Sequence, residues 1–100
     1  MEQLSFEFSG TTPIETPVHY GVVGSGDLEI LFFPTSEKVT HVSVTTGSDG
    51  FGPVWERVLR RFFERYPILA RVEIHDFGAT PGVVYLRLTQ ALEVLDDARL

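Results

Sequence analysis

The serine best placed for chemistry stands between two glycines, in the sequence Gly24-Ser25-Gly26-Asp27. Flanking glycines remove side-chain obstruction, so the Ser25 hydroxyl would be open to a bulky incoming group and to the enzyme that attaches it. A serine nucleophile would instead need a base and oriented hydrogen-bond donors, and no G-x-S-x-G elbow is present. On the pattern alone the favoured interpretation is an ordinary hairpin turn, a modification site is the functional alternative, and hydrolase chemistry at Ser25 is not expected.

Two further patterns resemble nucleotide-binding motifs but lack the context that those motifs need. Gly21, Gly24 and Gly26 have the wrong spacing for the dinucleotide fingerprint, and they lead into an expected strand instead of a helix. Asp76-Phe77-Gly78 matches the kinase metal-binding tripeptide, but 100 residues leave no room for the rest of that fold. We predict neither kind of nucleotide site.

The histidines His19, His41 and His75 fall on three different expected strands. Neither an H-E-x-x-H pattern nor a close histidine pair is present in the sequence, so we predict no metal site. We expect these side chains to lie on strand faces.

The Ser25 turn joins two runs of β-forming residues, Val18 to Val23 and Leu28 to Phe33. Glycines in such a turn are typical of a tight hairpin, which predicts two antiparallel strands with Ser25 at their tip. Before them, residues 1–16 contain a short alternation at Leu4 to Phe8 and then several turn residues. We expect this segment to be an extended N-terminal arm or an edge strand.

A third strand is predicted at Val39 to Thr46, which has the period of a half-buried strand, and Gly47 to Gly50 follows as a loop. Pro53 fits the first turn of a helix that Pro67 ends. The apolar positions of that helix form one stripe, made of Val54, Trp55, Val58, Leu59, Phe62 and Tyr66.

The C-terminal third of the sequence predicts one more strand and one more helix. Ala70, Val72 and Ile74 alternate with polar residues in a strand that leads into His75-Asp76-Phe77-Gly78-Ala79. Thr80-Pro81 is a helix start, and the helical spacing continues from Pro81 to about Leu95.

The element order β-β-β-α-β-α predicts an α+β fold. We expect a two-layer α/β sandwich of about four mostly antiparallel strands with two helices on one face. A chain of 100 residues, 43% of them hydrophobic, supports a single domain over residues 1–100. No stretch approaches the roughly 18 apolar residues of a membrane span, and the first residues lack a secretory pattern, so we expect a cytoplasmic protein without membrane partners.

Composition narrows the function classes. The sequence has no cysteine, so any thiol chemistry must use a borrowed thiol, and neither a disulfide nor a thiolate metal site is available. The net charge of -6 repels phosphate backbones and argues against nucleic acid as a partner. Arginines on the outer side of the first helix indicate a solvated face or, alternatively, a docking face; they are Arg57, Arg60, Arg61 and Arg65.

Three stretches of the sequence, taken together, match one family. They are Gly21 to Ile30 around the Ser25 turn, Ile74 to Val84, and Leu86-Arg87-Leu88 with Gln90-Ala91-Leu92-Glu93. On these residues nearly the whole chain resembles the acyl carrier (delta, or C) subunit of bacterial malonate decarboxylase. The related citrate lyase carrier shares Ser-Gly-Asp, but Phe77 and Thr80 to Val84 favour malonate decarboxylase. Ordinary acyl carrier proteins differ, because their serine lies in Asp-Ser-Leu at a helix start.

The resemblance implies that Ser25 carries 2'-(5''-phosphoribosyl)-3'-dephospho-CoA through a phosphodiester, and that Gly24, Gly26 and Asp27 form the attachment loop. It implies a non-catalytic carrier in malonate catabolism, whose prosthetic thiol holds acetyl and malonyl groups. The implied partners are the acyl transferase and decarboxylase subunits and the prosthetic-group transferase. A thioester suits the reaction because it stabilises the carbanion left by loss of CO₂, and tethering raises the effective concentration at each active site.

Several alternatives stay open at this stage. The chain could be a citrate lyase-type carrier, a non-covalent adaptor module or a stand-alone hydrolase that pairs Ser25 with a histidine. Asp27 could position the loop through hydrogen bonds to the backbone, which we favour, or it could be recognised by the loading enzyme. The Asp76 to Gly78 loop could lie near the hairpin tip and contact the prosthetic group or a partner, or it could be a purely structural link.

Overall fold

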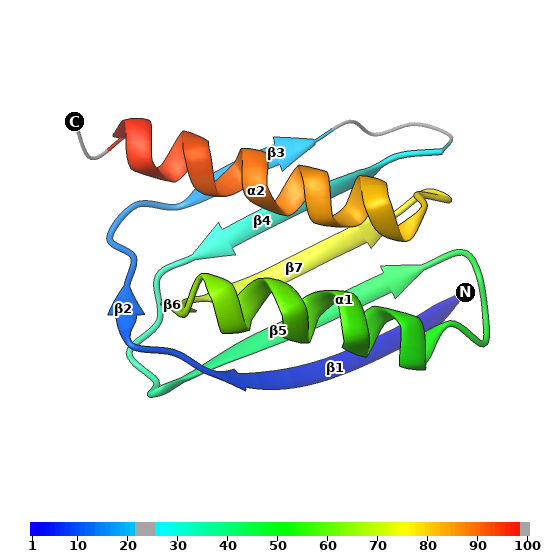
Figure 1. Ribbon diagram of the computed structural model, residues 1–100, viewed down its shortest axis with the longest axis horizontal. Helices are drawn as coiled ribbons and strands as arrows, with labels where there is room; N and C mark the ends of the chain where they lie inside the picture. The colour runs from blue at the N-terminus through cyan, green and yellow to red at the C-terminus, as the bar shows by residue number, and fades with distance from the viewer. Residues whose placement is uncertain (22–25, 99–100) are drawn as a thin grey trace.

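The computed structural model describes residues 1–21 and 26–98, with side chains described up to Leu95. Two helices cover one face of a β-sheet, which makes a two-layer α+β fold (Figure 1). The helices are α1 (Gly52–Arg65) and α2 (Pro81–Ala98). The strands are β1 (Glu2–Ser9), β2 (Thr12–Pro13), β3 (Val18–Gly21), β4 (Leu28–Phe33), β5 (Val39–Thr46), β6 (Ile68–Leu69) and β7 (Arg71–Asp76).

The strand count and pairing correct the prediction of about four mostly antiparallel strands. The main sheet of the described chain has five strands in the order β1-β5-β7-β4-β3, and β5 and β7 run parallel. The parallel pair arises because α1 is the crossover between β5 and β7, whereas the other neighbours in the sheet pair antiparallel. β2 and β6 form a separate two-stranded parallel ribbon near the C-terminal end of α1 (Figure 1). The α+β class with both helices on one face is confirmed.

The core lies between the sheet and the helices, as the alternation along each strand requires. In β4, Leu28, Ile30 and Phe32 are fully buried, while the residues between them are partly exposed on the other face. The helices contribute a matching set of buried side chains: Trp55, Leu59, Phe62, Phe63, Val84, Leu88, Ala91 and Leu95. The apolar stripe predicted for the first helix therefore faces the sheet.

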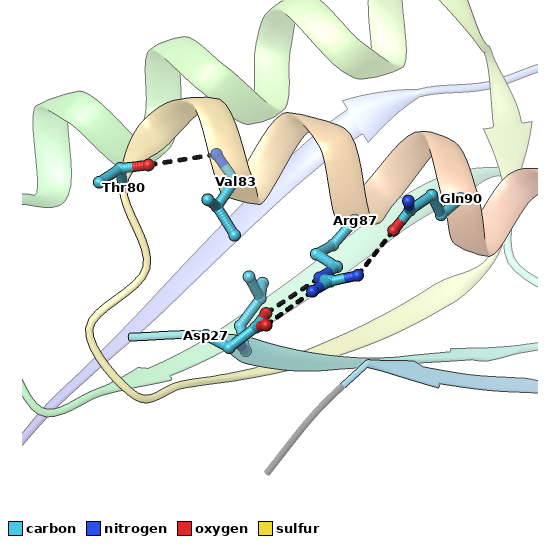
Figure 2. Close-up of polar contacts among 6 residues, drawn as sticks. Asp27, Thr80, Val83, Arg87 and Gln90 are labelled. Carbon is cyan, nitrogen blue, oxygen red and sulfur yellow. Dashed lines mark hydrogen bonds and ion pairs between the residues drawn. The ribbon is translucent and has the colours of Figure 1, made fainter. Parts of the chain in front are cut away.

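The helix boundaries follow the start and stop signals in the sequence. Pro53 lies in the first turn of α1, and the chain leaves the helix at Tyr66, just before Pro67. Thr80 caps α2, because its Oγ1 accepts a hydrogen bond from the Val83 amide at 3.3 Å (Figure 2). α2 continues to Ala98, a little beyond the predicted end at Leu95.

The arrangement brings several chain segments to one end of the molecule. The first turns of α1 and α2, the start of β4 and the ends of β5 and β7 all lie there (Figure 1). β3 and β4 pair antiparallel from Val18↔Phe32 to Gly21↔Glu29, as predicted for the hairpin. Within the described residues, neither helix is long and apolar enough to cross a membrane.

Candidate functional site

The predicted attachment loop is described only in part. Ser25 and Gly24 lie outside the described residues, while Gly26 and Asp27 are described. Gly26 is exposed and has a φ of 81°, a left-handed conformation that glycine adopts without strain. Among the described residues, no heavy atom lies within 4 Å of a Cβ added at Gly26, so the loop is open at this position.

The loop after β7 holds the described half of this turn by backbone hydrogen bonds. The amide of Gly26 donates to the carbonyl oxygen of Phe77 at 2.7 Å. The amide of Phe77 donates to the carbonyl oxygen of Asp27 at 2.8 Å. Because Gly26 and Asp27 both bond to Phe77, this pairing extends the β4–β7 ladder past Leu28↔Asp76 as a β-bulge, with Gly26 at its left-handed position. Of the two alternatives left open for the Asp76 to Gly78 loop, contact with the prosthetic group or a partner stays untested, and the loop lies against Gly26 and Asp27, the described residues next to the hairpin tip.

Asp76 gives this supporting loop its shape. The side chain is 7% exposed, and its Oδ1 accepts hydrogen bonds from the amides of Gly78 at 3.2 Å and Ala79 at 2.8 Å. Its Oδ2 accepts from the Oγ1 of Thr46, the last residue of β5, at 2.8 Å. Asp76 thus uses both carboxyl oxygens to fold the loop against the sheet, a structural role for this part of the Asp76-Phe77-Gly78 tripeptide.

An ion pair with α2 holds the side chain of Asp27 (Figure 2). Arg87 donates from Nε to Oδ1 at 3.0 Å and from Nη2 to Oδ2 at 2.7 Å, a bidentate arrangement. Arg87 also donates from Nη1 to Gln90 at 2.9 Å, which orients the guanidinium. The Arg87 hydrogen bond, followed by one from the Leu28 amide at 2.8 Å, lowers the pKa of the Asp27 carboxyl.

The predicted hydrogen bond between the Asp27 side chain and the backbone is present, but the ion pair of Asp27 with Arg87 was not predicted. The hydrogen bond from the Leu28 amide is the expected contact between an aspartate side chain and the backbone. Arg87 was not identified, although it lies in the Leu86-Arg87-Leu88 segment that supports the family resemblance. The sequence signal that could have identified Arg87 is that it is the one arginine in α2, a helix made mostly of apolar residues.

The three histidines lie on strands, as predicted, but two of them share an acidic partner. On the face of the sheet away from the helices, Glu29 binds His75 Nδ1 at 2.6 Å and His19 Nε2 at 2.9 Å. Hydrogen bonds from His75, first, and His19 lower the pKa of Glu29. His41 lies apart and contacts Glu7 and Glu37. The described residues contain no histidine and acid cluster arranged to hold a metal ion.

A cavity of about 310 Å³ opens beside the loop that supports Gly26 and Asp27. Its walls come from the first half of α1, the start of α2, the end of β5 and the loop after β7. Most of the lining is apolar, including Val54, Trp55, Val58, Ala79, Pro81 and Val84. Phe51 also lines it and is 52% exposed to solvent.

The arginines on the outer face of α1 make local contacts. Arg60 pairs with Glu56 one turn earlier, as expected for a solvated face, and Arg65 donates to the hydroxyl of Tyr66 at 3.0 Å. The guanidinium of Arg61 lies 5.8 Å from the ring centre of Tyr85. The pair of Arg60 with Glu56 is the contact four residues apart that the solvated-face interpretation predicts.

Comparisons with known proteins agree on one family. Residues 15–95 match the family described as Malonate decarboxylase delta subunit (MdcD). The malonate decarboxylase acyl carrier protein of Burkholderia cepacia is 50% identical over 94 residues, covering 91% of this chain and 87% of that one. The protein of the same name from Azotobacter vinelandii is 47% identical over 98 residues, covering 97% and 99%.

A solved structure shows the same fold. One chain of a Pseudomonas malonate decarboxylase hetero-tetramer, crystallised in complex with malonate, superposes with a TM-score of 0.89. The two chains are 43% identical, and the match covers 95% of this chain and 99% of that chain. These comparisons confirm the resemblance drawn from the Ser25 turn and the Ile74 to Val84 segment. The chain belongs to the malonate decarboxylase acyl carrier proteins, the delta-subunit family.

Proposed function

We propose that this chain carries acetyl and malonyl groups for a malonate decarboxylase complex, on a prosthetic group attached through a phosphodiester to Ser25. The proposed group is 2'-(5''-phosphoribosyl)-3'-dephospho-CoA, which supplies the thiol that holds each acyl group as a thioester. The proposed partners are the acyl transferase and decarboxylase subunits and the prosthetic-group transferase. The chain itself acts as a non-catalytic carrier, and residues 1–100 form one domain in which β1 pairs with β5.

The observation that carries this proposal is the contrast between the open side and the anchored side of the turn. On the open side, no atom of the described residues lies within 4 Å of a Cβ added to Gly26, so a large group has room there. On the anchored side, the backbone of Gly26 and Asp27 is paired with Phe77, and the Asp27 side chain is paired with Arg87. An anchored segment beside an attachment residue supports a tether on a rigid base.

The composition of the chain fits the same role. The sequence has no cysteine, so a thiol at this protein must come from an attached group. Gly26 keeps the left-handed backbone that the turn requires, and Arg87 fixes the carboxyl group of Asp27 against α2. These residues orient the attachment loop, while the acyl chemistry is left to the partner subunits.

The test is the intact mass of the protein produced with its loading enzymes. Wild-type protein should gain the mass of the complete prosthetic group, and Ser25→Ala should gain nothing. Ser43→Ala, which alters an exposed serine on β5, is the matched control and should be loaded like the wild type. A wild-type protein that stays unmodified beside active loading enzymes would refute the proposal.

The same variants separate a covalent carrier from a non-covalent adaptor. An adaptor needs only its surfaces, so Ser25→Ala would leave the decarboxylase activity of the assembled complex intact. A covalent carrier loses that activity in Ser25→Ala and keeps it in Ser43→Ala. Turnover of a simple ester by the purified chain alone would instead support a hydrolase.

A further inference from the structure

The cavity between α1 and α2 has the size and lining of a small-ligand site. Its volume is about 310 Å³, at the lower end of what small-molecule pockets occupy. Val54, Trp55 and Val58 line it from α1, and Pro81 and Val84 line it from α2. An apolar guest placed there would bury its surface against these side chains and gain the free energy of leaving water.

The buried polar side chains at the cavity, Thr46 and Asp76, already have hydrogen-bond partners. The Thr46 hydroxyl donates to Asp76, and the same aspartate accepts from the amides of Gly78 and Ala79. No side-chain nitrogen or oxygen that is buried among the described residues lacks a hydrogen-bond partner. Ser48, an exposed serine, is the other polar side chain in the described lining, and the remaining lining side chains are apolar. The buried part of the cavity therefore favours an uncharged, largely apolar guest.

The cavity also lies beside the attachment loop. Asp76, Gly78 and Ala79 form part of its wall, and the loop to which they belong is hydrogen-bonded to Gly26 and Asp27. Gly26 is the next residue after Ser25. A group tethered at Ser25 would sample this cavity at a millimolar effective concentration, so even a weak intrinsic affinity would keep it occupied for much of the time.

We propose that this cavity is the resting site for the uncharged end of the prosthetic group on Ser25, either the free thiol or the acetyl thioester. This inference rests on the proposed function. Asp76 is the charged residue that lines the cavity, and among the residues that the structure describes neither a lysine nor an arginine does so. A malonyl carboxylate would lose its hydration there without gaining a cationic partner, so the cavity disfavours the malonyl form and leaves it available to the partner enzymes.

The sequence makes the first test simple, because a loaded chain without cysteine has the prosthetic thiol as its sole thiol. Loading is first confirmed by intact mass, and the alkylation rate of the free thiol is then measured. An effective concentration of about 3 mM against a dissociation constant of about 1 mM would slow alkylation roughly fourfold relative to the free prosthetic group. Val54→Phe fills the cavity and should restore the faster rate.

Val94→Phe is the matched control, because Val94 is 39% exposed on α2 and does not line the cavity. It should alkylate like the wild type. Ala79→Leu narrows the cavity from its loop wall and serves as a second filling variant if Val54→Phe does not fold. Equal thiol rates in loaded wild-type, filled and control proteins would overturn the inference, whereas a missing adduct would refute the proposed function itself.

Trp55 provides a second measurement that does not depend on activity. It is the single tryptophan of the chain and lines the cavity, so its indole resonance and fluorescence report directly on the guest. Both should change on going from the unloaded to the acetyl-loaded protein, and should return toward the unloaded values in the malonyl-loaded protein. A Trp55 signal that responds only to an added partner subunit would assign the cavity to protein docking and overturn the inference.

Discussion

The Asp76 side chain accepts three hydrogen bonds that fold the loop after β7, and this loop pairs with Gly26 and Asp27 of the attachment loop. Removing the Asp76 carboxyl group therefore tests how the attachment loop is supported. In Asp76→Ala, the amides of Gly78 and Ala79 lose their acceptor, and the Thr46 hydroxyl keeps only its longer contact with the Ser48 carbonyl oxygen, at 3.4 Å. Because the loop in turn pairs with Gly26 and Asp27, the effect should extend to the turn that carries Ser25. The core residues of β7 are left unchanged.

The loss of stability in Asp76→Ala depends on how deeply each hydrogen-bond donor to Asp76 is buried. Thr46 is fully buried, so its hydroxyl loses a hydrogen bond in a site that water reaches poorly, at a cost of about 1–2 kcal/mol. The half-buried amide of Ala79 adds about 1 kcal/mol. Gly78 is exposed, and water can replace its bond at little cost. We therefore expect Asp76→Ala to lower the free energy of unfolding by about 2–3 kcal/mol, or the melting temperature by roughly 10 to 20 °C.

The assay is thermal and urea unfolding of the unloaded protein, followed by circular dichroism, with Asp76→Asn as the control. The asparagine carbonyl still accepts from the amides of Ala79 and Gly78, and its amide can donate to Thr46, so the loss should be about 1 kcal/mol or less. Hydrogen exchange should quicken at the amides of Phe77 and Gly26 in Asp76→Ala alone. Equal stability of the two variants, or unchanged exchange at Gly26, would refute this account of the loop.

Two further predictions concern the entry to the turn and its ion pair. Gly21→Ala should destabilise the protein by about 1–3 kcal/mol in urea unfolding, because Gly21 has a φ of 125° and a new Cβ would lie 2.3 Å from the Leu28 carbonyl oxygen. The control is Gly47→Ala, where a new Cβ would lie in open space, and it should change the free energy of unfolding by less than about 0.5 kcal/mol. Equal effects of the two substitutions would contradict this reasoning. The Asp27 pair with Arg87 lowers the pKa of Asp27 below its usual 3.8, so its stabilisation is complete above that pH and is lost as the pH falls through the lowered pKa. The melting temperature of wild type should therefore exceed that of Asp27→Asn at pH 7 by more than at acid pH, and a constant gap would count against the ion pair.

The local features of this protein were predictable because they depend on neighbours in the chain. Thr80 caps α2 through the Val83 amide three residues later, and Pro53 and Pro67 bound α1 by their missing amide and fixed φ. The alternation of β4 and the stripe of α1 follow from burial on one side, which leaves a period in the sequence. The glycine-flanked serine and the segments that match the family belong to the same class of local signal.

The partners of the site could not be predicted, because they come together only when distant segments fold. Arg87 lies 60 residues from Asp27, and Glu29 joins His19 and His75 from two other strands. Pairs at such separations leave no periodic pattern, and their geometry is set by how the helices and strands pack. The parallel pairing of β5 with β7 was missed because the sequence does not show which strands become neighbours in the sheet; once packing places these two side by side, the helical crossover α1 makes them parallel.

The sequence by itself determined the family, the cysteine-free composition that requires an external thiol, and most of the strands and helices. Each of these depends on residue types or on spacings of a few residues. The tertiary structure alone decided that the loop after β7 supports the turn, that Arg87 holds Asp27, and that an apolar cavity opens beside them. These features exist only where chain segments converge, because hydrogen bonding and burial depend on distance in space and not on distance along the chain.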